Sequence, residues 1–342
     1  MEWISCPLKS KTQNRMLLKF FKRPLPIVFA TIIVLAILLW LKSFFTGLSV
    51  AFYFDEAQMP LYSLVVNIIR DNGYLAKILA FTLVLFTGLY LIQLNSKYIL
   101  IKQRSYLPAF LYILLASSFL PLQRLNPAIF AALFLVIAIN FLFSIYDEKE
   151  PLDNLFKSGM FVSLAMMFYL PSIFYIILVF ISIIIIKTFN FRDWVAVLGG
   201  FVTPWFFYMF YQYFVHDNLW AIPQIIEAAW NTPRVKTDYG LFFYIFYYFN
   251  GFLFLISAIF LLRSINTQKI NIRKYHTILL WFLAVTFFIN VFVPFSSIEL
   301  SYLAAIPVSF IISNFLTSSR KKFWPDFLLI ALFAIAIIMQ FK

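Results

Sequence analysis

The chain has 342 residues, of which 63% are hydrophobic and 12% are charged, and its formal net charge is +13. A soluble protein cannot bury that much apolar surface, so the composition excludes an ordinary soluble enzyme or binding domain. Its single cysteine, Cys6, excludes an intramolecular disulfide, and its two histidines argue against a histidine-rich metal centre.

In chain order, a basic segment comes first and a series of apolar runs follows. Residues 1–25 carry six Lys and Arg side chains and are predicted to form a cytoplasmic arm, while 26–342 are predicted to form one transmembrane domain. Apolar runs of about 20 residues are typical of membrane spans, so we expect an all-α, polytopic protein with about 11 transmembrane helices. The expected spans are 26–45, 74–94, 106–120, 128–145, two short spans within 158–187, 194–214, 241–262, 277–293, 302–316 and 327–340.

The segment 158–187 is ambiguous because it has 30 residues and no charge before Lys187. It can form one long tilted helix or a helical hairpin that turns near Pro171. The hairpin keeps Lys187, Arg192 and the basic loop 263–274 on the same side as the other basic loops, so the positive-inside rule favours it. With the hairpin, 20 of the 27 Lys and Arg residues lie inside and 7 outside. This distribution predicts a cytoplasmic N-terminus and a periplasmic C-terminus.

The same distribution explains the net charge of the chain. Basic side chains are spread over several short loops and do not form one face of a folded domain, so nucleic acid is not an expected partner. Their excess on one side instead orients a protein whose expected partners are membrane lipids.

The predicted outer face contains two amphipathic helices. In the first, Leu61, Leu64, Val65 and Ile68 are predicted to form the apolar side, opposite Ser63, Asn67 and Arg70. In the second, Ile222, Ile225, Ile226 and Ala229 form the apolar side, opposite Gln224 and Glu227. Both patterns are typical of helices that lie in the membrane interface, although they are equally consistent with simple loop anchors.

An acidic pair, Asp55 and Glu56, follows the first span and is conspicuous in so apolar a chain. A carboxylate at this depth can take a proton from an acceptor hydroxyl or hold a divalent cation. Nearby cations can clamp the phosphate of a lipid-linked substrate. The candidate phosphate-binding residues are Arg70, Arg124, Arg234 and Lys236. Two adjacent acids are not a specific motif, so ordinary solvated loop charges are the competing interpretation.

This first outer loop resembles that of GT-C-type membrane glycosyltransferases. The resemblance is carried by Asp55-Glu56-Ala57, Tyr62, Arg70 and Asn72-Gly73, and further along by Arg124 and by Gly159, which begins the expected hairpin. It covers about residues 26–190 and leaves 191–342 as additional C-terminal helices. The resemblance implies a GT-C-like architecture, a polyprenyl-phosphate sugar donor, and a carboxylate that acts as base or metal ligand. The chain departs from the superfamily in its short first outer loop and its apolar Phe168-Tyr169-Leu170-Pro171.

The whole chain also resembles an uncharacterised family of inner-membrane proteins of Bacteroidota. The residues that carry this resemblance are Arg104-Ser105-Tyr106-Leu107-Pro108-Ala109, Phe168-Tyr169-Leu170-Pro171 and Phe189-Asn190-Phe191-Arg192-Asp193-Trp194, with Gly199, Gly200 and Pro204. It implies a bacterial inner-membrane location and no particular activity.

Three functional hypotheses stay open, and the sequence does not decide whether the protein is an enzyme. The first is a glycosyltransferase that uses a polyprenyl-phosphate-linked sugar, and the second is a non-catalytic scaffold subunit of an envelope complex. The third is a transporter or polysaccharide polymerase, for which internal repeats and charged groups at mid-membrane are expected and are not evident. Replacing Asp55 discriminates the first two, because a scaffold makes no demand on that carboxylate.

Overall fold

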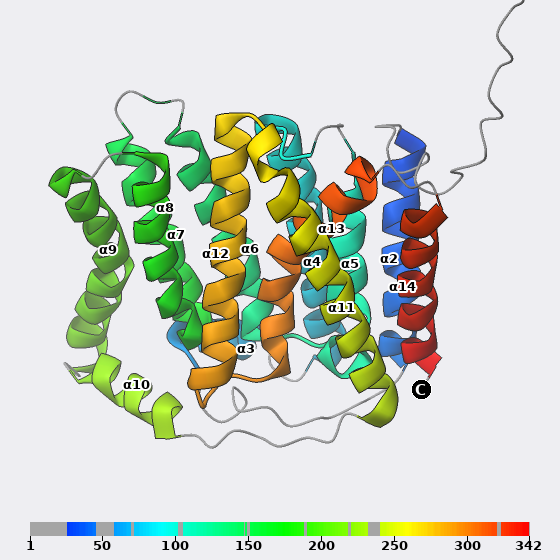
Figure 1. Ribbon diagram of the computed structural model, residues 1–342. Coiled ribbons are helices and arrows are strands. Elements are labelled where there is room, and N and C mark those ends of the chain that lie inside the picture. The colour runs from blue at the N-terminus through cyan, green and yellow to red at the C-terminus, as the bar shows by residue number, and fades with distance from the viewer. Residues whose placement is uncertain are drawn as a thin grey trace, which may run out of the picture.

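The protein is an all-α bundle in the computed structural model (Figure 1). The structure describes residues 26–45, 58–69, 72–101, 105–146, 148, 151–187, 190–217, 220–231, 240–319 and 323–341. The predicted cytoplasmic arm 1–25 lies outside the described residues. In the described part, thirteen α-helices and a few short 3-10 turns make up the whole regular structure.

The helices follow the apolar runs of the sequence closely. In chain order they are α2 (Pro26–Phe45), α3 (Pro60–Ile69), α4 (Gly73–Tyr98), α5 (Leu107–Ser117), α6 (Pro127–Ser144), α7 (Leu152–Phe168), α8 (Tyr175–Ile186), α9 (Phe191–His216), α10 (Ala221–Asn231), α11 (Gly240–Ser264), α12 (Ile270–Phe292), α13 (Ser301–Ser318) and α14 (Phe323–Phe341). Short 3-10 turns are η2 (Leu120–Leu122), η3 (Leu170–Phe174), η4 (Ile265–Thr267) and η5 (Ile298–Leu300).

Seven segments of the described chain are long and apolar enough to cross a membrane, so the protein is a multi-pass membrane protein. They contain α2, α4, α6, α9, α11, α12 and α13. Four expected spans, formed by α5, α7, α8 and α14, are not among the seven. The two shortest, α5 with 11 residues and α8 with 12, give about 17–18 Å of helix against a hydrocarbon core of about 30 Å. The count of about 11 spans therefore stays a prediction.

Successive long helices run in opposite directions, so their connections gather at two ends of the bundle (Figure 1). We call the end at which α14 finishes, marked C in the figure, the lower end. At the upper end, the hydroxyl of Tyr98 donates to the carbonyl of Asn140 at 2.7 Å, joining α4 to α6. At the lower end, the hydroxyl of Tyr302 donates to the carbonyl of Leu122 at 2.7 Å, joining α13 to the turn after α5.

The expected hairpin within 158–187 is confirmed. Helix α7 ends before Tyr169, whose backbone is extended, and η3 turns the chain into α8. The side chain of Lys274 bridges the two ends of this segment: its Nζ donates to the carbonyl of Ile186 at the end of α8 at 2.8 Å and lies 5.3 Å from the ring centroid of Tyr146, just after α6. The chain therefore enters and leaves this hairpin at the upper end.

Two glycines allow α7 and α9 to cross at backbone contact. A Cβ atom on Gly159 would lie 2.2 Å from the carbonyl oxygen of Val197, and one on Gly200 would lie 2.0 Å from that of Phe156. Small residues permit such close approach between membrane helices, where packing rather than hydrophobicity drives association. The crossing fixes α9 against the hairpin in the upper half of the bundle.

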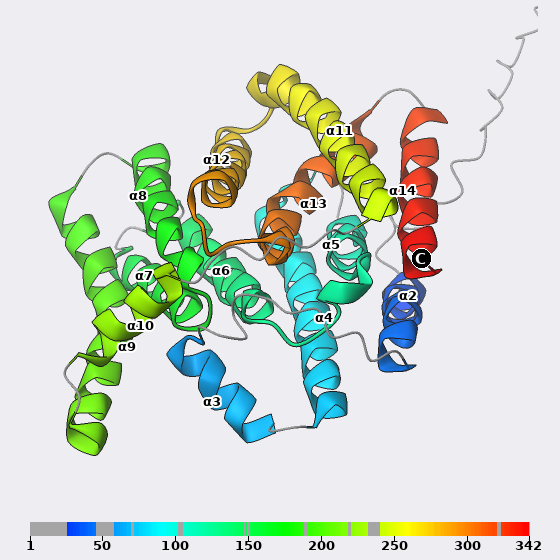
Figure 2. The same ribbon diagram turned by 90° about the horizontal axis from the view of Figure 1, so that it is seen from below.

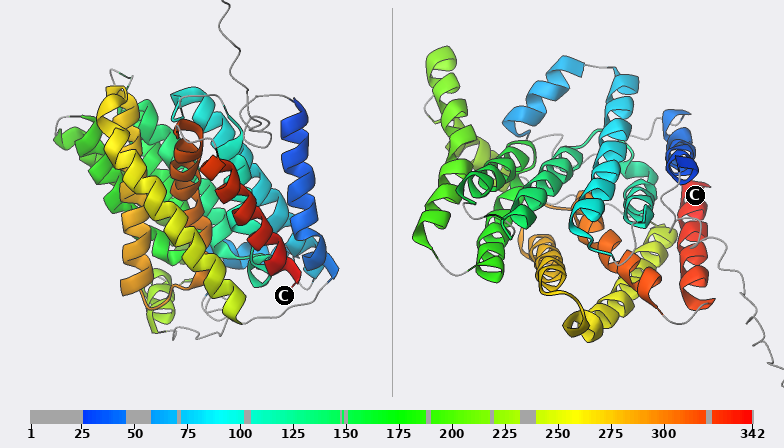
Figure 3. Two further views of the ribbon diagram at one scale, coloured as in Figure 1. Left: turned by 45° about the vertical axis from the view of Figure 1, so that its right-hand side comes forward. Right: turned by 90° about the horizontal axis from the view of Figure 1, so that it is seen from above.

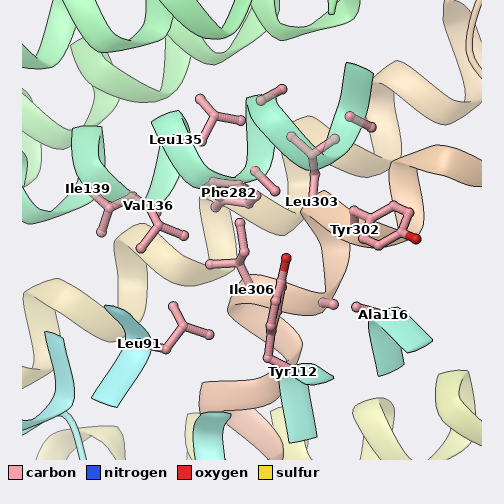
Figure 4. Close-up of a cluster of buried hydrophobic side chains, with 14 of the residues drawn as sticks. Leu91, Tyr112, Ala116, Leu135, Val136, Ile139, Phe282, Tyr302, Leu303 and Ile306 are labelled. Carbon is pink, nitrogen blue, oxygen red and sulfur yellow. The ribbon is translucent and has the colours of Figure 1, made fainter. Parts of the chain in front are cut away.

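Helix α13 occupies the centre of the bundle, and the close-up in Figure 4 shows its surroundings. Side chains from α4, α5, α6, α12 and α13 meet there, and all of them are buried: Leu91, Tyr112, Ala116, Leu135, Val136, Ile139, Phe282, Tyr302, Leu303 and Ile306. Helices α9, α11 and α14 lie at the periphery, as both views in Figure 3 show. Their outward faces carry exposed apolar side chains, as expected for helices that face lipid.

The two amphipathic segments are helices at the lower end, where Figure 2 shows α3 and α10 from below. For α10 the predicted apolar face is confirmed, because Ile222, Ile225 and Ile226 pack against the core. For α3 the predicted apolar face is divided: Leu61 and Val65 pack against the core, whereas Leu64 is 53% and Ile68 is 80% exposed.

Tyr62, which is buried, and Val66 and Ile69 also contact the core, so the protein-facing side of α3 overlaps the predicted apolar face only in part. The hydroxyl of Tyr62 also bonds to the bundle on this protein-facing side. A membrane protein can turn leucine and isoleucine outward because its surroundings are apolar, so amphipathicity alone does not identify the protein-facing side.

Basic side chains favour the upper end of the described part of the chain. At that end lie Lys97, Lys157, Lys187, Arg192, Arg263, Lys269, Arg273 and Lys274. Helix ends and turns at the lower end contain Lys42, Lys77 and Arg124. The asymmetry expected from the sequence thus appears as a difference between the two ends of the bundle.

Candidate functional site at the lower end

The turn between α5 and α6 forms the centre of the lower end. Its Gln123 is almost fully buried, and its amide nitrogen donates to the carbonyls of Leu39 at 3.1 Å and Ser117 at 2.5 Å. Ser43 donates in return to the carbonyl of Gln123 at 2.8 Å. The turn is therefore fastened to α2 by bonds in both directions, which satisfies backbone groups that lipid could not satisfy.

Asn126 ends this turn and starts the next helix. Its side-chain oxygen accepts the backbone N–H of Ile129 at 3.2 Å, an N-cap bond, and Pro127 occupies the first position of α6. Arg124 lies between Gln123 and Asn126 and is half-buried. Hydrogen bonds of Gln123 and Asn126 thus hold the backbone on both sides of Arg124. Arg124 is the one predicted phosphate-binding residue that lies in the described part of the chain.

The amphipathic helix α3 is tied to the same turn. The hydroxyl of Tyr62, which is buried, donates to the carbonyl of Leu125 at 3.2 Å. Met59, just before the helix, is also buried. In sequence, α3 is bracketed by Asp55-Glu56 on one side and Arg70 on the other.

A second polar group is buried at the tip of the helical hairpin. Glu299, in η5, is fully buried, and its Oε1 accepts the hydroxyl of Tyr169 at 3.0 Å and the backbone N–H of Ser297 at 2.9 Å. Its other oxygen accepts the hydroxyl of Ser297. A buried carboxyl needs such donors, because each unsatisfied polar group in this environment is costly. Glu299 thereby joins the hairpin tip to the loop between α12 and α13.

Helix α10 covers a further part of the lower end. The ring of Trp230 lies 5.3 Å from that of Phe295, which is buried in the loop before η5. On the opposite flank, Lys77 donates to the carbonyl of Ser43 at the end of α2. The lower end is therefore built from the turn 118–126, α3, η5 and α10.

Most of the predicted site falls on residues that the structure does not describe. Asp55 and Glu56, the predicted catalytic pair, lie outside the described residues, and so do Arg70, Arg234 and Lys236. Arg124 is described and lies in the turn that α3 contacts through Tyr62. The predicted convergence of these cations on Asp55 stays a prediction.

Sequence reasoning missed the two best-connected polar side chains of this end. Nothing in the local pattern of Glu299 indicates burial, because its partner Tyr169 is 130 residues away in the chain. Gln123 lies between apolar residues in a proline-bounded turn, which is a usable signal: an isolated amide there needs partners. Tyr62 was part of the resemblance, and its bond to Leu125 gives it a structural role.

The described residues of the lower end offer hydrogen-bond donors and the buried carboxyl of Glu299 but no preformed metal centre. Within the described ranges, no group of three or more His, Cys, Asp or Glu side chains could hold a metal ion. A divalent cation at Asp55 and Glu56 would require ligands from residues outside those ranges.

Comparisons with known proteins bear on identity alone. No curated protein and no solved structure matches the chain. The resemblance to GT-C-type glycosyltransferases therefore stays a prediction. A model of a family of unknown function, DUF6427, matches residues 57–342, which is most of the chain and contains every described helix except α2. The chain belongs to the DUF6427 family.

Proposed function

We propose that the protein is a glycosyltransferase-like membrane enzyme that acts on a polyprenyl-phosphate-linked sugar at the lower end of the bundle. The proposal includes the finer topology: a bacterial inner-membrane protein of about 11 spans, with a cytoplasmic N-terminus, a periplasmic C-terminus and a GT-C-like architecture. The excess of Lys and Arg at the upper end supports this orientation, because cytoplasmic loops retain basic residues. The lower end is then extracytoplasmic.

One observation carries the proposal, the bond from the hydroxyl of Tyr62 to the carbonyl of Leu125. It fastens α3 to the turn that contains Arg124. Because α3 is bracketed in sequence by the acidic pair and by Arg70, this bond supports a site in which carboxylates and phosphate-binding cations are neighbours. Interfacial helices are suited to such a site, since a lipid-linked phosphate sits at headgroup depth.

In this proposal each residue has a distinct role. Asp55 takes the proton of the acceptor hydroxyl, which then attacks the sugar carbon and displaces the lipid phosphate. Glu56 raises the proton affinity of its neighbour by like-charge repulsion, or joins it in holding a divalent cation. Arg124 holds the leaving phosphate, with Arg70, Arg234 or Lys236 as further clamps.

Complementation of a deletion strain tests this function. Asp55→Asn keeps the size and most hydrogen bonds of the side chain but cannot take a proton, so we expect loss of the glycolipid product with normal membrane insertion. Glu56→Gln should have a milder effect. Glu227→Gln on α10, an exposed carboxylate at the same end, is the matched control and should behave as wild type. Full rescue of the glycolipid profile by Asp55→Asn refutes catalysis by that residue.

A non-catalytic scaffold subunit of an envelope complex is the second candidate. The lower half of α11 favours it, because Leu241, Tyr244, Tyr247 and Tyr248 form a large exposed aromatic surface. This candidate requires two results: Asp55→Asn rescues the deletion strain fully, and Tyr247→Ala/Tyr248→Ala loses function. The transporter hypothesis gains no support, since the charged residues of the described spans all lie within two turns of a helix end.

A further inference from the structure

Helix α9 changes its relation to the bundle halfway along its length. Its upper half is locked to α7 through Gly200, and Trp205 is its last buried residue. Pro204 lies at this point and removes one backbone hydrogen bond of the helix. From Phe206 to His216, every residue except Tyr208 and Gln212 is exposed. Figures 2 and 3 show the helix leaving the other elements as it descends.

The two exceptions lie on the bundle-facing side of the helix. Spacings of three and four residues bring Trp205, Tyr208 and Gln212 onto one stripe, which continues the buried stripe of Val197 and Gly200. The amide nitrogen of Gln212 donates to the hydroxyl oxygen of Tyr208 at 2.8 Å. The rings of Trp205 and Tyr208 meet edge to face, with centroids 6.0 Å apart. A connected polar stripe thus runs along a helix whose other faces are apolar.

This stripe contains hydrogen-bond donors without acceptors. Trp205 is 9% exposed, and its buried indole N–H has no acceptor in the described part of the chain. The hydroxyl of Tyr208 accepts from Gln212, so its own proton is available to another acceptor. Buried donors are nearly always satisfied, because an unmade bond costs about 1–3 kcal/mol. An oxygen-bearing group beside Tyr208 would satisfy both.

The depth of the stripe in the membrane indicates which kind of molecule carries this oxygen-bearing group. Gln212 is four residues above the end of α9 and Trp205 is eleven, which corresponds to about 6 Å and about 16 Å along the helix. The donors therefore extend from the headgroup region into the lower half of the bilayer. The residues that flank them, such as Tyr211 and Phe214, are exposed on a membrane-spanning helix and face lipid.

We propose that Trp205, Tyr208 and Gln212 bind the headgroup of a membrane lipid that enters sideways between the lower half of α9 and the bundle. The three side chains supply neutral N–H and O–H donors, which suit the phosphate or hydroxyl oxygens of a lipid headgroup. A lipid fits better than a protein helix because the stripe starts at headgroup level and is flanked on both sides by lipid-facing aromatic residues. The site does not depend on Asp55, so it stands or falls separately from the proposed transferase activity.

Native mass spectrometry of the full-length protein with short-chain lipid probes tests the site. Dioctanoyl phosphatidylglycerol is the headgroup probe, and dioctanoylglycerol is the probe without phosphate. The variant Trp205→Phe/Tyr208→Phe keeps an aromatic ring at both positions and removes both donors, so we expect about tenfold weaker binding of the phospholipid. The matched control, Tyr211→Phe/Tyr213→Phe, removes two exposed hydroxyls from the same helix and should bind as wild type.

Three results would overturn the proposal. They are unchanged phospholipid binding by the double variant, equal binding of dioctanoylglycerol, and disulfide-linked dimers through Gln212→Cys in a Cys6→Ser background. The last result would make the stripe an interface between two copies. Gln212→Leu, at a half-exposed position, repeats the test if the double variant fails to fold. Asp55→Asn should bind the lipid normally, which separates this site from the proposed chemistry.

Discussion

At the crossing of α7 and α9, two glycines, Gly159 and Gly200, allow the helix backbones to touch because they carry no Cβ atom. A Cβ on Gly159 would meet the backbone of Val197, and backbone cannot move aside as a flexible side chain can. We expect Gly159→Ala to destabilise the protein by about 1–3 kcal/mol, because the overlap outweighs the gain of about 1 kcal/mol from better helix propensity. Thermal unfolding of the detergent-solubilised protein measures the effect.

The neighbouring glycine on α9 provides the control. A Cβ on Gly199 would lie 3.8 Å from the ring of Phe156, an ordinary contact, so Gly199→Ala should be neutral or stabilising. Equal loss of stability in the Gly159 and Gly199 variants would show that the close crossing is not the cause.

Sequence patterns pointed to both helices at this crossing but not to their contact. Gly159 and Gly200 were each part of a recognised motif, one at the start of the hairpin and one in the segment after it. Their pairing is a long-range fact, since 41 positions separate them. The local spacing of residues therefore does not predict which distant backbone a glycine will contact.

At the scale of elements, the hairpin of α7 and α8 determines the topology of everything that follows it. Because Lys274 links Tyr146 to Ile186, we expect cysteines at Asn154 and Asn190 to react with a membrane-impermeant maleimide only from the cytoplasmic side. The experiment uses a Cys6→Ser background, and Glu227→Cys on α10 should react only from the opposite side. Labelling of 154 and 190 from different sides would contradict the hairpin.

The amphipathic helices show how far periodicity can be trusted in a membrane protein. Helix α10 packs its predicted face inward, whereas α3 exposes Leu64 and Ile68. The existence of both helices was predictable, because apolar residues recur at the same helical spacing whether they face the protein core or the lipid. The rotation of α3 was not, because it depends on contacts with distant residues, such as the bond from Tyr62 to Leu125.

Across the whole molecule, the number and order of helices could be read from hydropathy, and so could the charge difference between the two ends. The central position of α13 could not, since the mean hydropathy of its segment, 1.6, lies between those of the peripheral spans that contain α9, 1.3, and α11, 2.1. Nor could the polar contacts of the lower end, where Glu299 and Tyr169 meet across 130 residues. Of the predicted site, the sequence identified charged residues near one end, and only Arg124 among them lies in the described part.

Three helices, α2, α5 and α14, are joined by hydrogen bonds among Trp40, Ser117, Ser118 and Gln340, which we call the polar seam. The amide nitrogen of Gln340 donates to the carbonyls of Ser117 at 2.7 Å and Ser118 at 3.3 Å. We expect Gln340→Leu to lower stability by about 1–2 kcal/mol, because it removes both bonds inside an apolar environment. Ile338→Leu, at an exposed position of the same helix, should have no effect in the same thermal assay. An unchanged unfolding midpoint for Gln340→Leu would mean that packing alone holds α14.

This seam also sets an order of assembly. A chain is synthesised from its N-terminus, so α2 and α5 enter the membrane long before α14 leaves the ribosome. Trp40 can bond to Ser117 early, but the carbonyl of Ser118 gains its bond from Gln340 only after α14 has been synthesised. Until then the growing bundle has an open polar edge toward lipid. Docking of α14 therefore closes this polar edge, and it can follow only after α2 and α5 have already met in the membrane.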